Sequence, residues 1–259
     1  MNIIASEKLE LLRKRHSVRT YSHDKIPQNV REKLKAEITM TNSHVSGLRF
    51  QLIFDNSDPF RGFFKSYGTF KNPNNYLVAI IDPSFENIEE KAGYYAERFV
   101  IKCVEEKIGT CFVGGTYDPR SIDVALRAGE KISFIVLFGY EAEKQRWNEK
   151  MLVSLVHRKQ FELSHFFIPS EEFESACEKI YTLKMGTEAV SIAPSAVNKR
   201  PVRIFVIEEG NSLTPCAKVE VKNYMNNIDL GIAKFNYNFV TDTQCQWGNG
   251  SPLIGGSED

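Results

Sequence analysis

The sequence predicts an α+β protein, in which short buried strands alternate with amphipathic helices. Three apolar runs, residues 49–55, 76–82 and 132–139, have the length and the Val, Ile, Leu and Phe content of buried strands. Residues 88–108 instead repeat apolar side chains at three- and four-residue spacing, which predicts a long helix that packs on two sides. With 259 residues, the chain can bury a substantial core as one large or two small domains.

Composition narrows the class of protein. Lys and Arg together number 33, as do Asp and Glu, so no overall basic field points to nucleic acid as a partner. The five cysteines are widely spaced without a C-x-x-C pair, which is typical of reduced thiols in the cytoplasm. No run approaches the length of a membrane span, and the N-terminus lacks the pattern of a secretory leader. We therefore expect a soluble cytoplasmic protein with no membrane partner.

The other elements expected in the first half are a helix over residues 6–14, a helix from Ile26-Pro27 onward, a loop over 58–75, and a strand over 111–113 that leads into the turn Gly114-Gly115. The apolar face of the second helix carries Val30, Leu34 and Ile38.

A related order of elements begins again near residue 153. Ile168-Pro169 repeats Ile26-Pro27, and a helix follows with Phe173, Cys177 and Ile180 inward. A strand over 202–208 and a helix over 229–239 complete the repeat. We therefore expect an internal duplication with halves at residues 1–150 and 151–259, ending in a loose glycine-rich tail from Gly248.

Two short stretches stand out chemically. The first is residues 13–21, where four cations, a histidine and two aliphatic hydroxyls follow a leucine-rich run. Arginine forks and a serine hydroxyl suit phosphate oxygens, although a helix C-terminus with solvated cations is an open alternative. The second is residues 193–198, where Pro194, Ser195 and Asn198 could hydrogen-bond the edge of a flat ring. A helix end followed by an Asn turn is the alternative there.

Together these stretches resemble the FMN-dependent nitroreductase family, which carries an R-x-S-x-R phosphate motif and a P-S-x-x-N flavin-edge motif. Here the motifs read Arg15-His16-Ser17-Val18-Arg19 and Pro194-Ser195-Ala196-Val197-Asn198. The long helix leading to a glycine turn matches residues 93–115, and a weaker K-x-R motif matches Lys144-Gln145-Arg146. The resemblance spans most of residues 9–240. It implies an α/β sandwich with a mixed, mainly antiparallel sheet flanked by helices.

The resemblance also implies a role for each matching residue. Arg15, His16, Ser17 and Arg19, with Lys144 and Arg146, would hold the FMN phosphate and ribityl chain. Pro194, Ser195 and Asn198 would border the isoalloxazine ring. The turn Gly114-Gly115 would bring a backbone N–H near the reactive flavin nitrogen. Because such a cofactor carries the hydride chemistry itself, no catalytic side chain is expected.

The implied activity is reduction of nitro compounds, quinones or similar electron-poor organic substrates by NAD(P)H, through ping-pong hydride transfer. One alternative is an FMN-binding protein without turnover, used for flavin storage or redox sensing. Another is a fold without flavin that serves as an interaction module, against which the retained motifs argue.

One departure from the family pattern bears on stoichiometry. Where the first half should carry its own flavin-edge motif, it reads Met40-Thr41-Asn42-Ser43-His44, without the proline. Where the second half should carry a phosphate motif, it reads Arg158-Lys159-Gln160-Phe161-Glu162-Leu163, without the second arginine. Each half keeps the motif that the other has lost. This is similar to the nitroreductase subfamily in which a fused chain imitates the dimer, and it implies one FMN per chain and a monomer acting as a pseudo-dimer.

Three further candidates carry less weight. His157 and His165 lie eight residues apart, which is not a metal-binding spacing, so no metal is expected. Cys103 and Cys111 are interpreted as core residues. Trp247 could cover the flavin or anchor the tail, and the sequence leaves both open.

Overall fold

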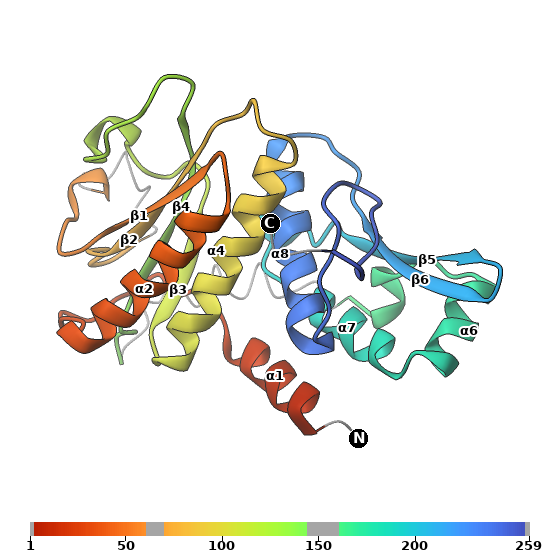
Figure 1. Cartoon of the computed structure of the whole chain (residues 1–259). Coiled ribbons are helices and arrows are strands. Elements are labelled where there is room, and N and C mark those ends of the chain that lie inside the picture. Colours follow the sequence, from red (N-terminus) through yellow and green to blue (C-terminus); the bar gives the residue numbers. More distant parts are fainter. Residues whose placement is uncertain (1–2, 61–69, 144–160, 257–259) are drawn as a thin grey trace. The chain divides into compact units, whose positions relative to one another are not determined.

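The computed structural model describes residues 3–60, 70–143 and 161–256 (Figure 1). It divides into two compact units, each assembled from separate stretches of chain. We call one the sheet unit (Lys14–Ile88 and Phe99–Arg158) and the other the C-terminal unit (Met1–Arg13, Glu89–Arg98 and Lys159–Asp259). This division interleaves the chain, whereas the sequence suggested a single boundary near residue 150.

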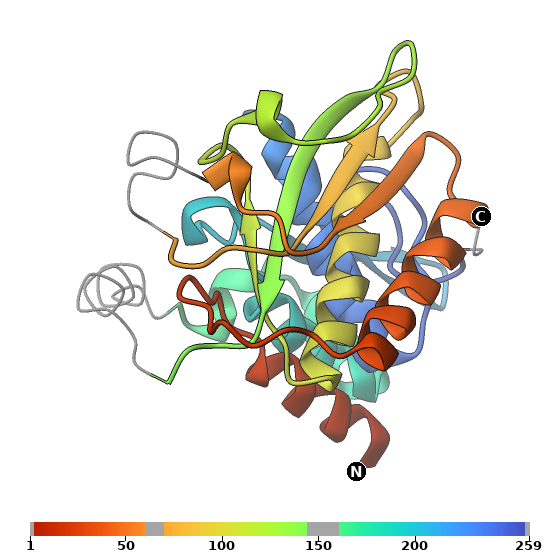
Figure 2. The ribbon, with the colours of Figure 1, turned by 90° about the vertical axis from the view of Figure 1, so that its left-hand side faces the viewer.

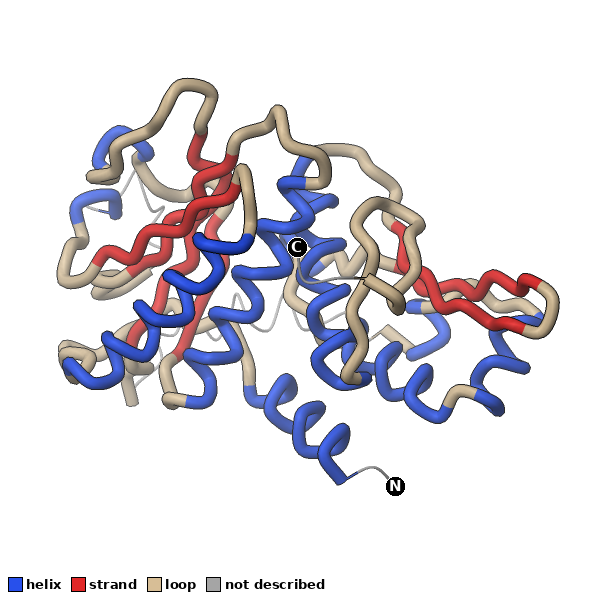
Figure 3. Tube along the Cα trace, in the orientation of Figure 1, coloured by secondary structure: helices blue, strands red, loops and turns tan. Residues whose placement is uncertain are grey.

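The sheet unit contains an antiparallel sheet whose order, among the described residues, is β1-β2-β4-β3 (Figure 3). Its elements are α2 (Gln28–His44), β1 (Leu48–Ile53), β2 (Tyr76–Ile81), the second part of α4 (Ile88–Glu105), β3 (Gly109–Val113) and β4 (Lys131–Gly139), with 3₁₀ turns at Asp58–Phe60 and Pro119–Ser121. All six residues of β2 are buried, because β2 and β4 are the central strands of the sheet.

Helix α2 packs along β1 as its apolar pattern predicts. Val30, Leu34 and Ile38 are all buried. Near the end of the helix, Asn42 Nδ2 donates to Phe50 O at 2.9 Å, and Phe50 N–H donates back to Asn42 Oδ1 at 2.7 Å. This pair of hydrogen bonds fixes α2 on the strand and gives the Asn42 side chain a structural role.

The C-terminal unit is mainly helical and carries one antiparallel hairpin among its described residues (Figure 1). Figure 2 shows a long helix of this unit, Tyr224–Thr241, in blue. The helices of the unit are α1 (Ile3–Lys14), which belongs to this unit as far as Arg13, the first part of α4, α6 (Glu171–Lys179), α7 (Tyr181–Ser191) and α8 (Tyr224–Thr241). Its strands are β5 (Arg203–Glu209) and β6 (Ser212–Lys218), and 3₁₀ turns lie at Leu163–Phe166 and Ala196–Asn198. Asn223 caps α8 and shares a capping box with Asn226.

Within this unit, α8 crosses the first part of α4 at glycines. A Cβ on Gly93 of α4 would overlap the carbonyl oxygen of Ile228, and a Cβ on Gly231 of α8 would overlap that of Glu90. The missing side chains therefore let the two backbones approach closely.

A buried ion pair lies close to this crossing. Lys234 Nζ donates to Glu90 Oε1 at 2.6 Å and to the carbonyl oxygens of Gln246 and Gly248, while Glu90 Oε2 accepts from the Gly248 N–H. Both charges are thus satisfied with no exposed side-chain area beyond 3 %.

Three details differ from the expectation. Strand β6 was not predicted, because its sequence SLTPCAK contains a proline and little apolar alternation. The helix expected to bury Phe173, Cys177 and Ile180 ends at Lys179, and of these three only Phe173 is buried. The glycine-rich tail is hydrogen-bonded as far as it is described, with Leu253 N–H donating to Pro215 O and Leu253 fully buried.

The α+β class and the antiparallel strand pairing agree with the prediction. Over the described ranges, none of the helices is both long and apolar enough to cross a membrane.

Candidate cofactor-binding site

Residues 15–19 form an extended segment at the edge of the sheet unit. Val18 is its anchor: it is buried, and its N–H donates to Thr110 O of β3 at 2.8 Å. Arg19 O accepts from the Lys71 N–H at 2.9 Å. Because side chains alternate along an extended segment, burying Val18 leaves its neighbours Ser17 and Arg19 half-buried at the surface.

The cations of the basic stretch have different surroundings. Arg13 belongs to the C-terminal unit and forms ion pairs with Glu10 and Glu188, which raise the pKa of its guanidinium. His16 Nε2 lies 2.9 Å from Glu141 Oε2. Arg15 is half-buried, and no carboxylate among the described residues pairs with it. Arg15 is therefore the cation of this stretch best suited to meet an anion.

The glycine turn after β3 is exposed. A Cβ built on Gly115 would meet no other atom within 4 Å. Packing within the described part of the chain therefore does not require glycine here, and the backbone N–H groups of the turn can be approached closely. Lys144 and Arg146, the predicted K-x-R clamp, lie outside the described residues.

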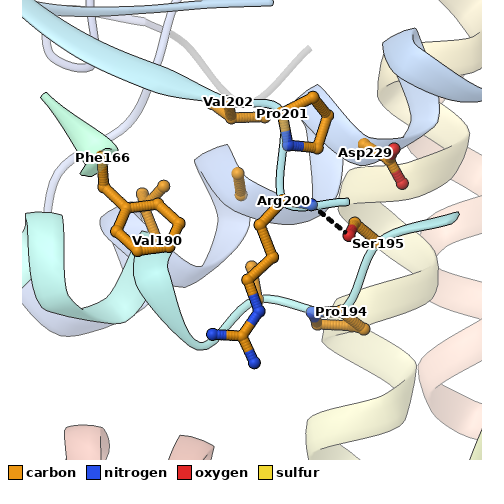
Figure 4. Close-up of a pocket in the computed structure, with 10 residues that line it drawn as sticks. Phe166, Val190, Pro194, Ser195, Arg200, Pro201, Val202 and Asp229 are labelled. Atoms are coloured by element: carbon orange, nitrogen blue, oxygen red, sulfur yellow. Dashed lines mark hydrogen bonds between the residues drawn. The ribbon is translucent and has the colours of Figure 1, made fainter. Parts of the chain in front are cut away.

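Pro194–Arg200, which we call the 194–200 loop, connects α7 to β5 in the C-terminal unit. Arg200 stabilises the loop with three hydrogen bonds, and Figure 4 shows the one to Ser195. The Arg200 N–H donates to Ser195 Oγ at 2.8 Å, its Nε donates to Asn198 Oδ1 at 3.1 Å, and its Nη1 donates to Ser191 O at 2.8 Å. One arginine thus orients both polar side chains of the P-S-x-x-N motif.

Asp229 of α8 holds the loop from the other side. Its Oδ1 accepts the Ala196 N–H at 2.9 Å. The side chain is buried, and its Oδ2 has no hydrogen-bond partner in the described part of the chain. Burial raises the pKa of Asp229 to about 7, although the Ala196 N–H and the positive charge of Lys199 oppose that shift. Figure 4 shows the Arg200 guanidinium directed away from Asp229.

The backbone of the loop is strained. Val197, Asn198 and Arg200 have φ angles of 52°, 53° and 46°, in the left-handed region that favours glycine. For the β-branched Val197 this is a marked outlier, and its side chain is 84 % exposed, so packing does not compensate. Each such residue costs about 1–3 kcal/mol, and such strain gathers at functional sites.

A small cavity opens beside the loop. Its volume is about 10 Å³, enough for roughly one water molecule. Its lining combines polar groups of the loop and α8 with apolar side chains: Phe166, Val190, Ala193, Pro194, Ser195, Arg200, Pro201, Val202, Asp229 and Ala233.

The predicted site residues in the described ranges are divided between the two units. Arg15, His16, Ser17 and Arg19 lie in the sheet unit with Gly114 and Gly115, whereas Pro194, Ser195 and Asn198 lie in the C-terminal unit. That both groups serve one site is part of the proposal below. Sequence reasoning missed Arg200 and Asp229. The only local signals were a basic residue just after the P-S-x-x-N motif and a lone acid in the otherwise apolar helix stretch 228–233.

Trp247 lies in the C-terminal unit against aromatic side chains. Its ring is 5.3 Å from that of Tyr94 and 6.2 Å from that of Tyr95, and Lys91 Nζ is 5.4 Å from its centroid. These contacts fit the anchoring interpretation of Trp247. Among the described residues, no group of three or more His, Cys, Asp or Glu could hold a metal ion.

Comparison with known proteins identifies the family. A family model described as "Putative TM nitroreductase" matches residues 7–240. No curated protein matches the chain. The crystal structure of a putative nitroreductase from Thermotoga maritima MSB8 matches with a TM-score of 0.55 and 20% identity, over 90% of this chain and 82% of that one.

Two further matches are slighter. A nitroreductase with bound FMN from Bacteroides fragilis NCTC 9343 has a TM-score of 0.45 and 14% identity, over 63% of this chain and 99% of that one. A putative nitroreductase in complex with FMN from Desulfovibrio desulfuricans has a TM-score of 0.40 and 13% identity, over 60% of this chain and 98% of that one. With TM-scores below 0.5, neither match is used to assign the fold or the function of this chain. The match over residues 7–240 suffices: this chain has the nitroreductase-like fold and belongs to the family described as putative TM nitroreductase.

Proposed function

We propose that the protein binds FMN and uses it to reduce nitro compounds, quinones or similar electron-poor organic molecules with NAD(P)H. Family membership supports an oxidoreductase in general terms. The observation that carries the cofactor assignment is Arg15, a half-buried arginine without a carboxylate partner in the described ranges, at the start of an R-x-S-x-R segment. Such a group is most stable when a phosphate meets it.

The chemistry of the donors in each unit suits one end of FMN. Arg15, Ser17 and Arg19 offer guanidinium and hydroxyl donors to the phosphate and the ribityl chain, with His16 beside them. The 194–200 loop offers Pro194, Ser195 and Asn198 to the ring edge, and the exposed turn Gly114-Gly115 offers backbone N–H groups. Lys144 and Arg146 remain candidates for the clamp.

FMN, when bound, supplies the hydride chemistry, in two half-reactions with donor and acceptor in turn. The protein would then hold the phosphate, orient the ring edge and leave one face of the ring exposed, on which the two reactants stack in turn.

We further propose an internal duplication with a single FMN per chain. The order α2, β1, β2, α4 is matched by α6 and α7, β5, β6, α8, and α4 and α8 both have 18 residues. The opposite pseudo-site would join Phe161, Glu162 and Leu163 to Thr41, Asn42 and His44, with His44 where the motif has Asn. The Asn42 amide is already hydrogen-bonded to Phe50, and the Glu162 carboxylate would repel a phosphate. A fused chain of this kind can function as a monomer.

The test is spectroscopic. The purified protein is expected to show a flavin absorption band, or to gain one when FMN is supplied, with one flavin released per chain and a monomeric mass by light scattering. Bound FMN is expected to bleach with NADH or NADPH in the absence of air, and an added quinone or nitro compound is expected to restore the band. Failure with both donors would favour an FMN-binding protein without turnover. Two flavins per chain would contradict the proposal of a single FMN site.

A further inference from the structure

The 194–200 loop is held at two points by residues outside its P-S-x-x-N motif. Asp229 accepts the Ala196 N–H at 2.9 Å across 33 residues of sequence, so this is a tertiary contact. Arg200 binds Ser195 Oγ through its backbone N–H and Asn198 Oδ1 through its Nε. Asp229 thus acts at the first residue of the short turn Ala196–Asn198, and Arg200 acts at the residue before the turn and at its last residue.

The loop would not keep this shape by local preference. Val197, Asn198 and Arg200 are all left-handed without being glycine, and the side chain of Val197 points into solvent with 84 % of it exposed. The strain must be offset by contacts that over-determine the backbone. The hydrogen bonds from Asp229 and Arg200 are contacts of that kind.

Holding the loop through the buried carboxyl group of Asp229 is unfavourable for stability. A buried carboxyl group with one oxygen unpartnered within the described part of the chain is less favourable for folding than an apolar or amide side chain. A residue that lowers folding stability, where another side chain would give a more stable protein, is expected at a functional site rather than in a purely structural position.

We propose that Asp229 and Arg200 are positioning residues that preorganise the 194–200 loop to receive the edge of the flavin ring. Asp229 fixes the peptide between Ser195 and Ala196, and Arg200 fixes the side chains of Ser195 and Asn198. A loop ordered in advance loses less conformational freedom on binding, which strengthens affinity without a new contact. The proposal rests on the proposed function, since it assigns this loop to the ring.

Flavin binding to the apo-protein tests the role of Asp229. We compare the dissociation constants of FMN and riboflavin, from quenching of flavin fluorescence, for wild type, Asp229→Ala and Asp229→Asn. Asp229→Ala is expected to weaken both flavins alike, on the order of tenfold, because they share the ring. Asp229→Asn keeps an acceptor oxygen for Ala196 and is expected to restore most of the affinity. Unchanged binding by Asp229→Ala, or equal loss by both variants, overturns the role of Asp229.

Arg200→Lys provides a second test that leaves the buried carboxyl intact. It retains the charge and the backbone N–H but loses the fork that reaches Asn198 and Ser191. Several-fold weaker binding of both flavins is expected, and wild-type binding would remove Arg200 from the proposal. Amide hydrogen exchange of the apo-protein adds a readout without flavin: the Ala196 N–H should exchange faster in Asp229→Ala than in wild type, and an equal rate would contradict the proposal.

Arg15→Ala is the matched comparison, because loss of a phosphate contact should weaken FMN much more than riboflavin and leave the Ala196 exchange rate unchanged. A wild-type protein that binds neither flavin overturns the proposed function and this inference with it. Wild-type binding with unaffected Asp229 and Arg200 variants overturns this inference alone.

Discussion

Gly93 and Gly231 stand in a reciprocal relationship across the contact of α4 and α8. Each faces the backbone carbonyl of the residue three positions before the other, since Gly93 meets Ile228 and Gly231 meets Glu90. Reciprocal contacts of this kind are the mark of a two-fold interface between equivalent elements. Here both helices belong to one chain, which supports the proposed duplication.

The glycine contact gives the first prediction. Gly93→Ala and Gly231→Ala each place a methyl group against a backbone carbonyl that cannot rotate away, so each should lower the free energy of unfolding by about 1–3 kcal/mol. Urea denaturation measures the loss. Gly115→Ala is the control, because its Cβ would meet no atom within 4 Å and stability should change by less than about 0.5 kcal/mol. Equal stability of all three variants would mean that the helices are not in close contact.

The left-handed Val197 gives a second prediction. Val197→Gly removes steric strain, and the side chain lost is 84 % exposed, so little packing disappears. Glycine also adds flexibility to the unfolded chain, which opposes the gain. We expect a net increase in unfolding free energy of about 0.5–1 kcal/mol, measured by urea denaturation. A loss of stability would show that the Val197 backbone is not strained.

A third prediction concerns the pH dependence of stability. The pKa of Asp229 is about 7 in the folded protein and has its ordinary value of 3.8 in the unfolded chain. Between these values the folded state keeps a proton that the unfolded state has released, so raising the pH favours unfolding. The contribution of the Asp229 proton to the free energy of unfolding is fully present below pH 3.8 and is lost as the pH rises to about 7. The change is on the order of 4 kcal/mol.

Asp229→Asn cannot lose that proton and isolates the effect. Relative to this variant, the wild-type apo-protein should become less stable as the pH rises from 4 to 7, measured by urea denaturation at several pH values. Parallel stability profiles for the two proteins over this pH range would contradict a pKa raised by burial and would show that Asp229 is ionised in the folded protein as well.

Local patterns predicted the elements whose side chains face one core. The spacing of Val30, Leu34 and Ile38 identified the buried face of α2, and the apolar runs identified β2 and β4. Strand β6 escaped prediction because Pro215 and its polar neighbours give it no strand pattern, and tertiary hydrogen bonds to residues 250–253 stabilise it instead.

The candidate site was predictable only in part, for the same reason. Arg15, Ser17, Pro194 and Ser195 were found because their motifs are local. The contact of Asp229 with Ala196 joins residues far apart in sequence, which no spacing rule reveals. Asn42 shows the reverse case. It lies in the stretch Met40–His44, which the sequence suggested as a degenerate flavin-edge motif, and the structure reveals a side chain that ties α2 to Phe50.

The phosphate assignment predicts unequal effects from neighbouring cations. Arg15→Ala and Arg19→Ala should each weaken FMN by roughly 1.5–3 kcal/mol, the scale of a hydrogen bond to a charged group. Lys14→Ala is the matched control, because Lys14 is exposed at the end of α1 and should contribute little. Equal losses at all three positions, from fluorescence titration, would favour a diffuse cationic surface over a specific clamp.

The measurement that tests the central claim most directly compares FMN with riboflavin on wild type and on Arg15→Ala. The two flavins differ only in the phosphate, so their difference in affinity isolates the phosphate contacts. We predict that wild type binds FMN on the order of a hundredfold more tightly than riboflavin, and that Arg15→Ala removes at least about tenfold of that preference. Equal affinities for FMN and riboflavin in the wild-type protein would contradict the phosphate site and the function built on it.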